Sequence, residues 1–267
     1  MKKILIGAAC AAVALCVFGC SKKASASDPV SALQSRGEFV LGLDDSFPPL
    51  GFRDENNEIV GYDIDLAKEV ASRLGVTFRA QPIDWSAKEQ ELATGKIDCI
   101  WNGLTITDER KAALSFTKPY LENAQVVVVR DDSGIKTLSD LAGKTLGLQS
   151  GSSAADALDE ATEVKKSLKS VVEFKENITA LNDLEIGGVD GVVMDSVVAN
   201  YSIQQTGKPF VVLEQGLAAE AYGVAFRKNE PALADKVQSV LEEMAGDGTI
   251  ASISIKWFGH DISVVGK

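Results

Sequence analysis

Histidine and cysteine are almost absent from this 267-residue chain. His260 is the only histidine, and Cys99 is the only one of the four cysteines that lies beyond residue 20. A lone histidine argues against a His-based catalytic triad and against a metal site built from several imidazoles. A lone cysteine cannot form a disulfide within the chain, and its apolar neighbours indicate a buried, inert thiol rather than a nucleophile. No segment has the spacing of a zinc site, a P-loop or a dinucleotide-binding loop, so we expect neither metal nor cofactor.

Positive charge is also scarce. The 27 Lys and Arg residues stand against 38 Asp and Glu residues, which gives a net charge of −11 at pH 7. Proteins that bind phosphate backbones need clustered Lys and Arg, so this balance argues against nucleic acid as a partner. Apolar residues make up 45% of the chain and charged residues 24%, which is ordinary for a soluble globular protein. The length suffices for two lobes, each with a core of its own.

The N-terminal apolar run is too short to span a bilayer comfortably. It covers residues 4–18, follows Lys2-Lys3 and ends at Val17-Phe18-Gly19-Cys20. This arrangement resembles a bacterial lipoprotein signal, in which cleavage before Cys20 leaves the thiol to carry lipid. An ordinary secretory signal and a simple membrane anchor are the alternatives. The resemblance implies a protein held by lipid on the outer face of a membrane, and we expect residues 21–37 to be a flexible tether.

Short β-like runs alternate with helical patterns along the rest of the chain. Leu66, Val70 and Leu74 recur at four-residue spacing before Gly75, which predicts a helix over 63–74. The alternation predicts an α/β fold with mainly parallel sheets. We expect strands at 39–43, 76–80, 97–101, 125–130, 146–149, 171–174, 191–194, 210–213 and 222–226. We expect further helices at 85–94, 178–186, 196–205, 231–245 and 249–257, and one that begins at Ser152-Ser153.

One sequence pattern occurs twice. Residues 95–100 and 187–192 each read as a glycine stop, an apolar residue, an aspartate and a buried strand. Small or polar residues follow both strands: Asn102, Gly103 and Thr105 after the first, and Asp195 after the second. Ligands of open α/β sheets bind beyond the carboxyl ends of the strands, so two such ends indicate one site shared by two lobes. The alternative is that this loop is simply common in α/β folds.

Arg110 is the sharpest candidate for binding an anion. Thr107 can cap a helix whose first turn contains Arg110, and a cation at that end of a helix is electrostatically unfavourable unless it binds an anion. A guanidinium pairs with a carboxylate through two parallel hydrogen bonds, and Thr105 can add a hydroxyl. The alternative is a surface arginine that pairs with Asp108 or Glu109.

Six motifs occur in an order that resembles the bacterial extracellular solute-binding proteins of family 3, the polar amino-acid receptors of ATP-driven importers. The resemblance extends from about Phe39 to Phe258. The motifs are Gly42-Leu43-Asp44 with Phe47-Pro48-Pro49, Gly61-Tyr62-Asp63-Ile64-Asp65-Leu66-Ala67, Gly95-Lys96-Ile97-Asp98, Leu104-Thr105-Ile106-Thr107 with Arg110, Phe116-Thr117-Lys118-Pro119-Tyr120, and Trp257-Phe258-Gly259.

The resemblance implies a two-lobed periplasmic-binding-protein fold of the type II kind, with two crossing hinge strands near 125–130 and 222–226. Lobe 1 would comprise residues 38–126 and 222–267, and lobe 2 residues 127–221. The protein would be a monomer that binds a free amino acid and delivers it to an ABC permease and ATPase complex.

The resemblance also implies roles for individual residues. Arg110 and Thr105 would bind the α-carboxylate of the ligand, with help from the helix start at Ser153. Asp195 would bind the α-ammonium together with acceptors near Asn102 and Gly103, although Gly103 lacks the hydroxyl that relatives supply. The side chain of the ligand would lie among the remaining residues of the site, which are Asp44, Phe47, Trp85 and Gln149.

Structural roles remain open for several of these residues. Asp195 could cap the helix that begins at Ser196, Phe47 and Trp85 could be core, and Asp44 could fix its own loop. In relatives that bind basic ligands, an acidic residue at the place of Asp44 reaches the distal cation, so a basic ligand is favoured while glutamine and cystine stay open. An amino-acid sensor working with a signalling partner, and an exported cyclohexadienyl-type dehydratase, are the alternative functions. No pair of titratable groups suggests catalysis, so we expect a protein that is not an enzyme.

Overall fold

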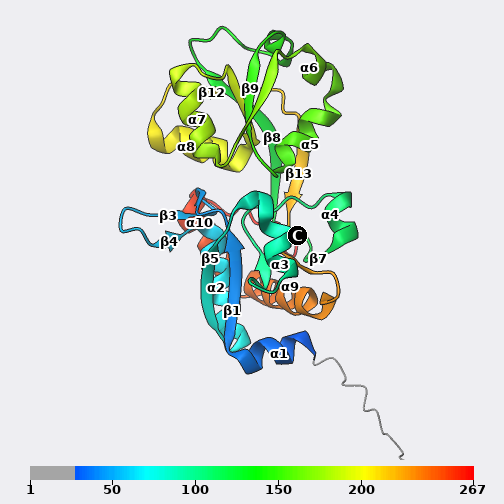
Figure 1. Cartoon of the computed structure of the whole chain (residues 1–267). Coiled ribbons are helices and arrows are strands. Elements are labelled where there is room, and N and C mark those ends of the chain that lie inside the picture. The colour runs from blue at the N-terminus through cyan, green and yellow to red at the C-terminus, as the bar shows by residue number, and fades with distance from the viewer. Residues whose placement is uncertain (1–27) are drawn as a thin grey trace, which may run out of the picture.

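The computed structural model describes residues 28–267 and has two lobes, each built on its own β-sheet (Figure 1). The predicted signal sequence, including Cys20, and the first part of the predicted tether lie outside the described residues. In the part of the chain that the structure describes, no helix is long and apolar enough to cross a membrane. The predicted α/β class and two-lobed architecture are confirmed.

Lobe 1 contains a five-stranded sheet and a small three-stranded one. The five strands are, in spatial order, β5 (Thr77–Pro82), β1 (Glu38–Leu43), β6 (Cys99–Ile100), β14 (Ala225–Arg227) and β7 (Leu114–Phe116). β1 is parallel to both of its neighbours, β5 and β6, whereas β14 is antiparallel to its neighbours. The small antiparallel sheet comprises β2 (Ser46–Phe47), β3 (Gly51–Arg53) and β4 (Ile59–Val60).

Lobe 2 contains a six-stranded mixed sheet. Its main order is β10 (Ser170–Phe174), β9 (Thr145–Gln149), β11 (Gly191–Asp195), β8 (Leu121–Arg130) and β12 (Phe210–Val212), and β13 (Ala218–Tyr222) also pairs with β8. The run Val126–Val129 of β8 is buried, as a continuous β-branched stretch predicts for a central strand. Each lobe thus has a core of parallel strands: β5, β1 and β6 in lobe 1, and β10, β9 and β11 in lobe 2.

Helices cover the faces of both sheets. Lobe 1 contains α1 (Pro29–Arg36), α2 (Tyr62–Leu74), the 3-10 turn η1 (Trp85–Ala87), α3 (Lys88–Ala93), α4 (Asp108–Ala113), α9 (Pro231–Gly246) and α10 (Thr249–Phe258). Lobe 2 contains the 3-10 turn η2 (Leu138–Leu141), α5 (Ser153–Glu160), α6 (Thr162–Ser167), α7 (Asn177–Ile186) and α8 (Ser196–Thr206). The predicted helices agree with these bounds to within three residues, and α4 begins after Thr107 as expected, whereas α1 and α6 were not predicted.

Two antiparallel strands connect the lobes. β8 and β13 pair from Leu121 opposite Tyr222 to Gln125 opposite Ala218, and this ribbon forms the waist of the molecule (Figure 1). The second connecting strand, β13, lies earlier in the chain than the predicted 222–226. It ends at Tyr222, and after an interruption at Gly223 the next strand, β14, begins at Ala225. A Cβ at Gly223 would lie 2.8 Å from Ile106 Cδ1, so this break passes close against lobe 1. The predicted lobe boundaries stay a prediction.

The C-terminal part of the predicted tether is a helix, which corrects that prediction. Asp28 caps α1 by accepting the backbone N–H of Ser31 at 3.1 Å, and Gly37 ends the helix in the left-handed conformation. Leu33 is buried, and Gln34 Nε2 donates to the carbonyl of Leu74 at 3.1 Å. Residues 29–36 therefore form a docked helix rather than a tether, held by the buried Leu33 and by the hydrogen bond of Gln34.

The repeated sequence pattern has the same structural role in both lobes. The backbone N–H of Asp98 donates to Val40 O at 2.8 Å, and its carboxylate accepts the N–H of Val40 at 2.8 Å. Asp190 forms the same pair of bonds with Thr145, each at 2.8 Å. Both aspartates thus fix the start of the neighbouring parallel strand.

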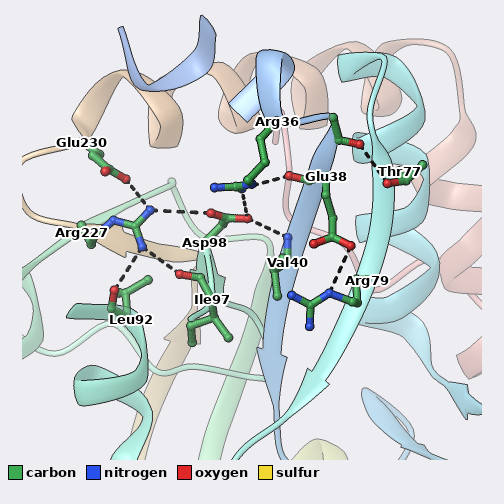
Figure 2. A network of polar contacts seen from close by, with 11 residues as sticks. Arg36, Glu38, Val40, Thr77, Arg79, Leu92, Ile97, Asp98, Arg227 and Glu230 are labelled. Carbon is green, nitrogen blue, oxygen red and sulfur yellow. Dashed lines mark hydrogen bonds and ion pairs between the residues drawn. The ribbon is translucent and has the colours of Figure 1, made fainter. Parts of the chain in front are cut away.

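Arginines complete the Asp98 arrangement in lobe 1. Figure 2 shows the carboxylate of Asp98 between Arg36 and Arg227, with nitrogen–oxygen distances of 2.5 and 3.7 Å. Arg227 also donates to the carbonyls of Leu92 and Ile97. This network lies near the start of β1, and its contacts give Asp98 a structural role.

Candidate ligand-binding site

The candidate site lies where strands of both lobes end against each other. β1 ends at Leu43, just before Asp44, and β6 ends at Ile100, just before Asn102 and Gly103. In lobe 2, Gln149 is the last residue of β9 and Asp195 the last residue of β11. Because these strands are parallel within each lobe, the predicted residues gather at the facing edges.

The predicted carboxylate-binding residues of the two lobes are in direct contact. Ser153 Oγ, at the start of α5, donates to Thr105 Oγ1 of lobe 1 at 3.0 Å. Arg110 Nη1 donates to the carbonyl of Thr105 at 3.0 Å, and its Nη2 reaches Gly151 O in lobe 2 at 3.4 Å. Two cationic or polar donors and a helix N-terminus therefore converge here, as binding of an anion requires.

The reason for the position of Arg110 differs from the one that the sequence suggested. Thr107 does cap α4, since its Oγ1 accepts the N–H of Arg110 at 3.1 Å. However, α4 has only six residues, so Arg110 is as close to its C-terminal end as to its N-terminal end. The helix-dipole argument therefore has no weight. The alternative, in which Arg110 pairs with Asp108 on the surface, also disagrees with the structure, because Asp108 pairs instead with Lys111 at 2.6 Å.

Asp195 accepts hydrogen bonds from side chains of the hinge ribbon. Its Oδ1 accepts from Asn123 Nδ2 at 2.7 Å, Gln125 Nε2 at 2.9 Å and Tyr222 OH at 2.7 Å. The alternative role as a helix cap is wrong, because Asp195 occupies the N-cap position of α8 without a capping hydrogen bond from its side chain. The carboxylate is thus held by the hinge and not by the helix that follows it.

Burial makes Asp195 an unusual carboxylate. Only 5% of the residue is exposed. Loss of solvent, followed by the nearby charge of Glu220, raises the pKa of Asp195 to about 7, against the opposing hydrogen bonds from Tyr222 and Asn123. An ionised carboxylate in this place is stabilised by a cation, which a ligand ammonium would supply.

Asn102 and Gly103 shape the floor of the site rather than simply offering acceptors. Asn102 Oδ1 accepts the N–H of Asp44 at 3.0 Å. The N–H of Gly103 donates to Asp63 Oδ2 at 2.9 Å. Gly103 has φ +60°, and a Cβ there would lie 2.7 Å from Leu50 Cδ1 and 2.9 Å from Phe47 Cε1. Any side chain at this position would be strained by the positive φ and would crowd Leu50 and Phe47, which accounts for glycine in this chain.

Asp44 and Gln149 bridge the lobes at the predicted side-chain end. Gln149 Nε2 donates to Asp44 Oδ2 at 2.7 Å, and both residues are buried. Burial raises the pKa of Asp44 to about 6, against the hydrogen bonds from Gln149 and Ser46. Asp44 Oδ1 also accepts the N–H of Ser46 at 2.9 Å, so Asp44 fixes its loop as well as facing lobe 2.

The two predicted aromatic walls lie in the same region. Phe47 is 5% exposed and packs against Gly103, while Trp85 is 7% exposed in the turn before α3. Lys88 Nζ lies 5.2 Å from the centre of the Trp85 ring. The structure therefore brings all ten predicted site residues to the boundary between the lobes, but their roles towards a ligand stay a prediction.

Sequence reasoning missed four polar residues of this region. Asn123 and Gln125 on β8, and Glu220 and Tyr222 on β13, each follow a period of two that places their side chains on one face of the ribbon. Polar residues at alternate positions of an apolar strand were the signal that could have identified them. Asn123 lies directly opposite Glu220 in the register, so the four form one cluster.

Lys88 is a further residue that the sequence did not indicate. Its Nζ donates to Gly151 O of lobe 2 at 2.8 Å, and only 3% of the residue is exposed. Burial lowers the pKa of Lys88. Lys88, Arg110 and Gly151 also line a cavity of about 300 Å³ at the boundary between the lobes. The predicted carboxylate end of the site therefore has a second cation beside Arg110, and this one is buried.

No metal site accompanies these residues. Among residues 28–267, no group of three or more His, Cys, Asp or Glu side chains is placed to hold an ion. Cys99 is buried, and burial raises the pKa of its thiol well above the ordinary value. A protonated, buried thiol is a poor nucleophile, so the interpretation of Cys99 as an inert core residue agrees with its environment.

Comparison with known proteins defines the family. Residues 39–260 match the bacterial extracellular solute-binding proteins, family 3, and the chain belongs to this family. It is 31% identical over 255 residues to the L-cystine-binding protein TcyJ of Escherichia coli K12, covering 94% of each chain. It is 32% identical over 265 residues to the ABC transporter arginine-binding protein 1 of the same organism, covering 97% of this chain and 99% of that one.

A solved structure shares the fold over nearly the whole chain. The histidine-bound substrate-binding protein of an ABC uptake transporter from Streptococcus pneumoniae superposes with a TM-score of 0.86 at 38% identity. The match covers 89% of this chain and 99% of that one. The family and the two-lobed fold expected from the sequence motifs are both confirmed.

Proposed function

We propose that this protein is the extracytoplasmic substrate-binding component of an ABC importer and that it captures a free polar amino acid by closure of its lobes. One observation carries the proposal. A continuous chain of contacts runs from Arg110 through Thr105, Ser153 and Gln125 to Asp195, so a buried carboxylate and a guanidinium lie at the two ends of one network.

The charges match an amino acid. A zwitterion has a carboxylate and an ammonium, and burying either one unpaired would be very unfavourable. Arg110 belongs to lobe 1 and Asp195 to lobe 2, so both charges of the ligand are paired only when the lobes meet. The ligand would therefore bind the closed form more tightly than the open form, which is what drives closure.

Contacts between the lobes support this mechanism. The bonds Ser153–Thr105, Gln149–Asp44 and Lys88–Gly151 all cross the boundary through predicted ligand-binding residues or their neighbours. An amino acid entering between the lobes would exchange these bonds for bonds of its own. The importer would then recognise the closed protein.

A basic ligand is favoured over a neutral one. Asp44 lies at the side-chain end of the site, and its carboxylate is buried with one amide donor, Gln149, facing it from lobe 2. A distal cation would replace this neutral donor with a charged one. Cystine stays open as a ligand, because its second ammonium could also pair with Asp44.

The remaining expectations belong to the same proposal. We expect no catalytic turnover, because each buried titratable group of the site is held by hydrogen-bond partners that suit binding. We expect a lipid on Cys20 to hold a monomer at the membrane, with the permease and ATPase as its partners. If the protein were a sensor, its partner would be a signalling protein instead. Measuring amino-acid uptake by membranes that contain the permease and ATPase distinguishes the importer role from the sensor role.

Calorimetric titration with the twenty common amino acids, ornithine, citrulline and cystine tests the proposal. We expect at least one of them to bind without being consumed. Arg110→Ala should weaken this binding at least a hundredfold, because the ligand carboxylate would be buried without its charged donor. Lys111→Ala is the matched control, since Lys111 neighbours Arg110 on α4 but pairs only with the exposed Asp108. Full affinity in Arg110→Ala would remove Arg110 from the site.

A further inference from the structure

Glu220 is a second carboxylate at the end of the site that contains Asp195. Its Oε2 accepts from Asn123 Nδ2 at 3.0 Å and from Gln125 Nε2 at 3.0 Å. The same two nitrogens donate to Asp195 Oδ1. Two carboxylates therefore share the same pair of neutral donors and lie within a few ångström of each other.

The shared donors do not neutralise the two carboxylates. Asn123 and Gln125 are uncharged amides, and the third partner of Glu220 is the hydroxyl of Thr105, which donates to it at 2.9 Å. Arg110 bonds to the backbone carbonyl of Thr105 and to Gly151, and forms no ion pair with either carboxylate. Negative charge thus exceeds positive charge at this end of the site.

An unpaired acceptor points to a missing donor at the same place. Gln125 is fully buried, and within the described part of the chain its Oε1 has no hydrogen-bond partner. The Nε2 of the same amide contacts Asp195, Glu220 and Ser153. A buried acceptor without a partner is unfavourable, and here it is attached to the group that joins the two carboxylates.

We propose that Glu220, together with Asp195, forms a doubly acidic subsite for the cationic amine of the ligand, and that Glu220 thereby determines selectivity for amines over neutral analogues. An ammonium group has three N–H donors, which matches two carboxylates and one amide oxygen. This inference rests on the proposed function, because it names a further residue of the same site. The influence of Glu220 on the pKa of Asp195 is consistent with this proximity.

The charged and titratable groups around this subsite come from several elements. Tyr222 donates to Asp195 from β13, and Arg110 faces Thr105 from α4. Asp63 lies behind Tyr120, whose ring is 6.3 Å from that of Tyr222. Glu220 is the only one of them that adds negative charge directly beside Asp195, since both accept from Gln125.

The variant Glu220→Gln tests the proposal. It removes one charge while keeping a side-chain oxygen that can accept from Thr105, Asn123 and Gln125. The matched control is Glu122→Gln, because Glu122 lies on the partner strand of the same ribbon, opposite Ala221, and its side chain is exposed. Glu220→Asp tests whether restoring the charge restores the effect.

The readout compares two ligands that differ only at the amine. We would use L-arginine with 5-guanidinopentanoate, or L-glutamine with 4-carbamoylbutanoate, according to which amino acid the wild-type protein binds. Glu220→Gln should lower the affinity ratio of amine to des-amino ligand about tenfold or more, since a charge at this range shifts such an equilibrium by one or more powers of ten. Glu122→Gln should leave the ratio unchanged, and Glu220→Asp should recover most of it.

Two outcomes would overturn the inference. If Glu220→Gln weakens both ligands equally, Glu220 serves only to hold Thr105 and the hinge. If the ratio stays at the wild-type value, Glu220 does not contribute to amine selectivity. Either result leaves the proposed function intact as long as the wild-type protein binds an amino acid, whereas failure of every amino acid to bind the wild-type protein refutes the proposed function itself.

Discussion

Replacing Asp195 with asparagine should stabilise the empty protein at pH 8 while it impairs ligand binding. The folded protein raises the pKa of Asp195 from 3.8 to about 7. Between these two pH values the folded state holds a proton that the unfolded state has lost, so wild-type stability falls as the pH rises through this window. At about 1.4 kcal/mol per pKa unit, the ionised carboxylate destabilises the fold by about 4 kcal/mol at pH 8.

Asparagine recovers only part of this energy. It keeps an oxygen for Asn123, Gln125 and Tyr222, but hydrogen bonds to a neutral acceptor are weaker than those to a carboxylate. We therefore expect a net gain of about 1–3 kcal/mol at pH 8, which corresponds to a rise of a few degrees in Tm for a chain of this size. Between pH 8 and pH 5 wild type regains about 3 kcal/mol, because pH 5 lies two units below the folded-state pKa of about 7, so the advantage of asparagine should disappear or reverse there. The rest of the wild-type stability returns only below the unfolded-state pKa of 3.8.

Two measurements on the same variant check this reasoning. Thermal unfolding of wild type and Asp195→Asn at pH 5 and pH 8 gives the stability difference and its pH dependence. Calorimetry with the amino acid that binds the wild type should show an affinity loss of at least about thirtyfold, as expected when a buried charge loses its partner. A variant that is destabilised equally at both pH values, with unchanged affinity, would refute the charge argument and assign Asp195 a purely structural role.

Three further predictions concern other positions of the site. Gly103→Ala should destabilise the protein by about 1–3 kcal/mol in chemical unfolding. Gly37→Ala is the control and should cost about 1 kcal/mol, because Gly37 has a similar positive φ but open space around it. Equal effects of the two substitutions would show that crowding at Gly103 is unimportant. Asp44→Asn should weaken a basic ligand at least tenfold more than a neutral one in competition titrations, and a uniform loss would exclude a distal cation subsite. Amino-acid affinity should fall as the pH decreases from 8 to 5, because protonation of Asp195, whose pKa is about 7, removes the partner of the ammonium; a flat profile by calorimetry would contradict this.

Several predictions came from patterns that depend on interactions between residues close together in the sequence. The helix α2 was predicted from four-residue spacing and a glycine stop, and both its period and its end at Gly75 are as expected. The repeated aspartates Asp98 and Asp190 indicated two similar halves, and they make identical backbone bonds. Such features follow from side-chain period and from short-range hydrogen bonding, so the sequence alone could reveal them.

The missed features required contacts between distant segments. α1 was predicted to be part of the tether because its sequence has little apolar character, and contacts with distant segments, through Leu33, Gln34 and Arg36, fix it as a helix on lobe 1. The sequence also could not show why position 103 is a glycine, because its close neighbours Phe47 and Leu50 lie more than fifty residues earlier in the chain. Crowding between segments that are distant in the sequence cannot be recognised from the residues around either segment.

The sequence by itself determined the α/β alternation and the two-lobed family, because period, turn residues and motif order can be read along the chain; the pairing of Arg110 and Asp195 with a ligand stays a prediction. Only the tertiary structure decided how the negative end of the site is built. Pairing of β8 with β13 places Asn123 opposite Glu220, and the end of β11 brings Asp195 to the same amides. Register between strands almost a hundred residues apart fixes that cluster, and register is set by the packing of the whole fold.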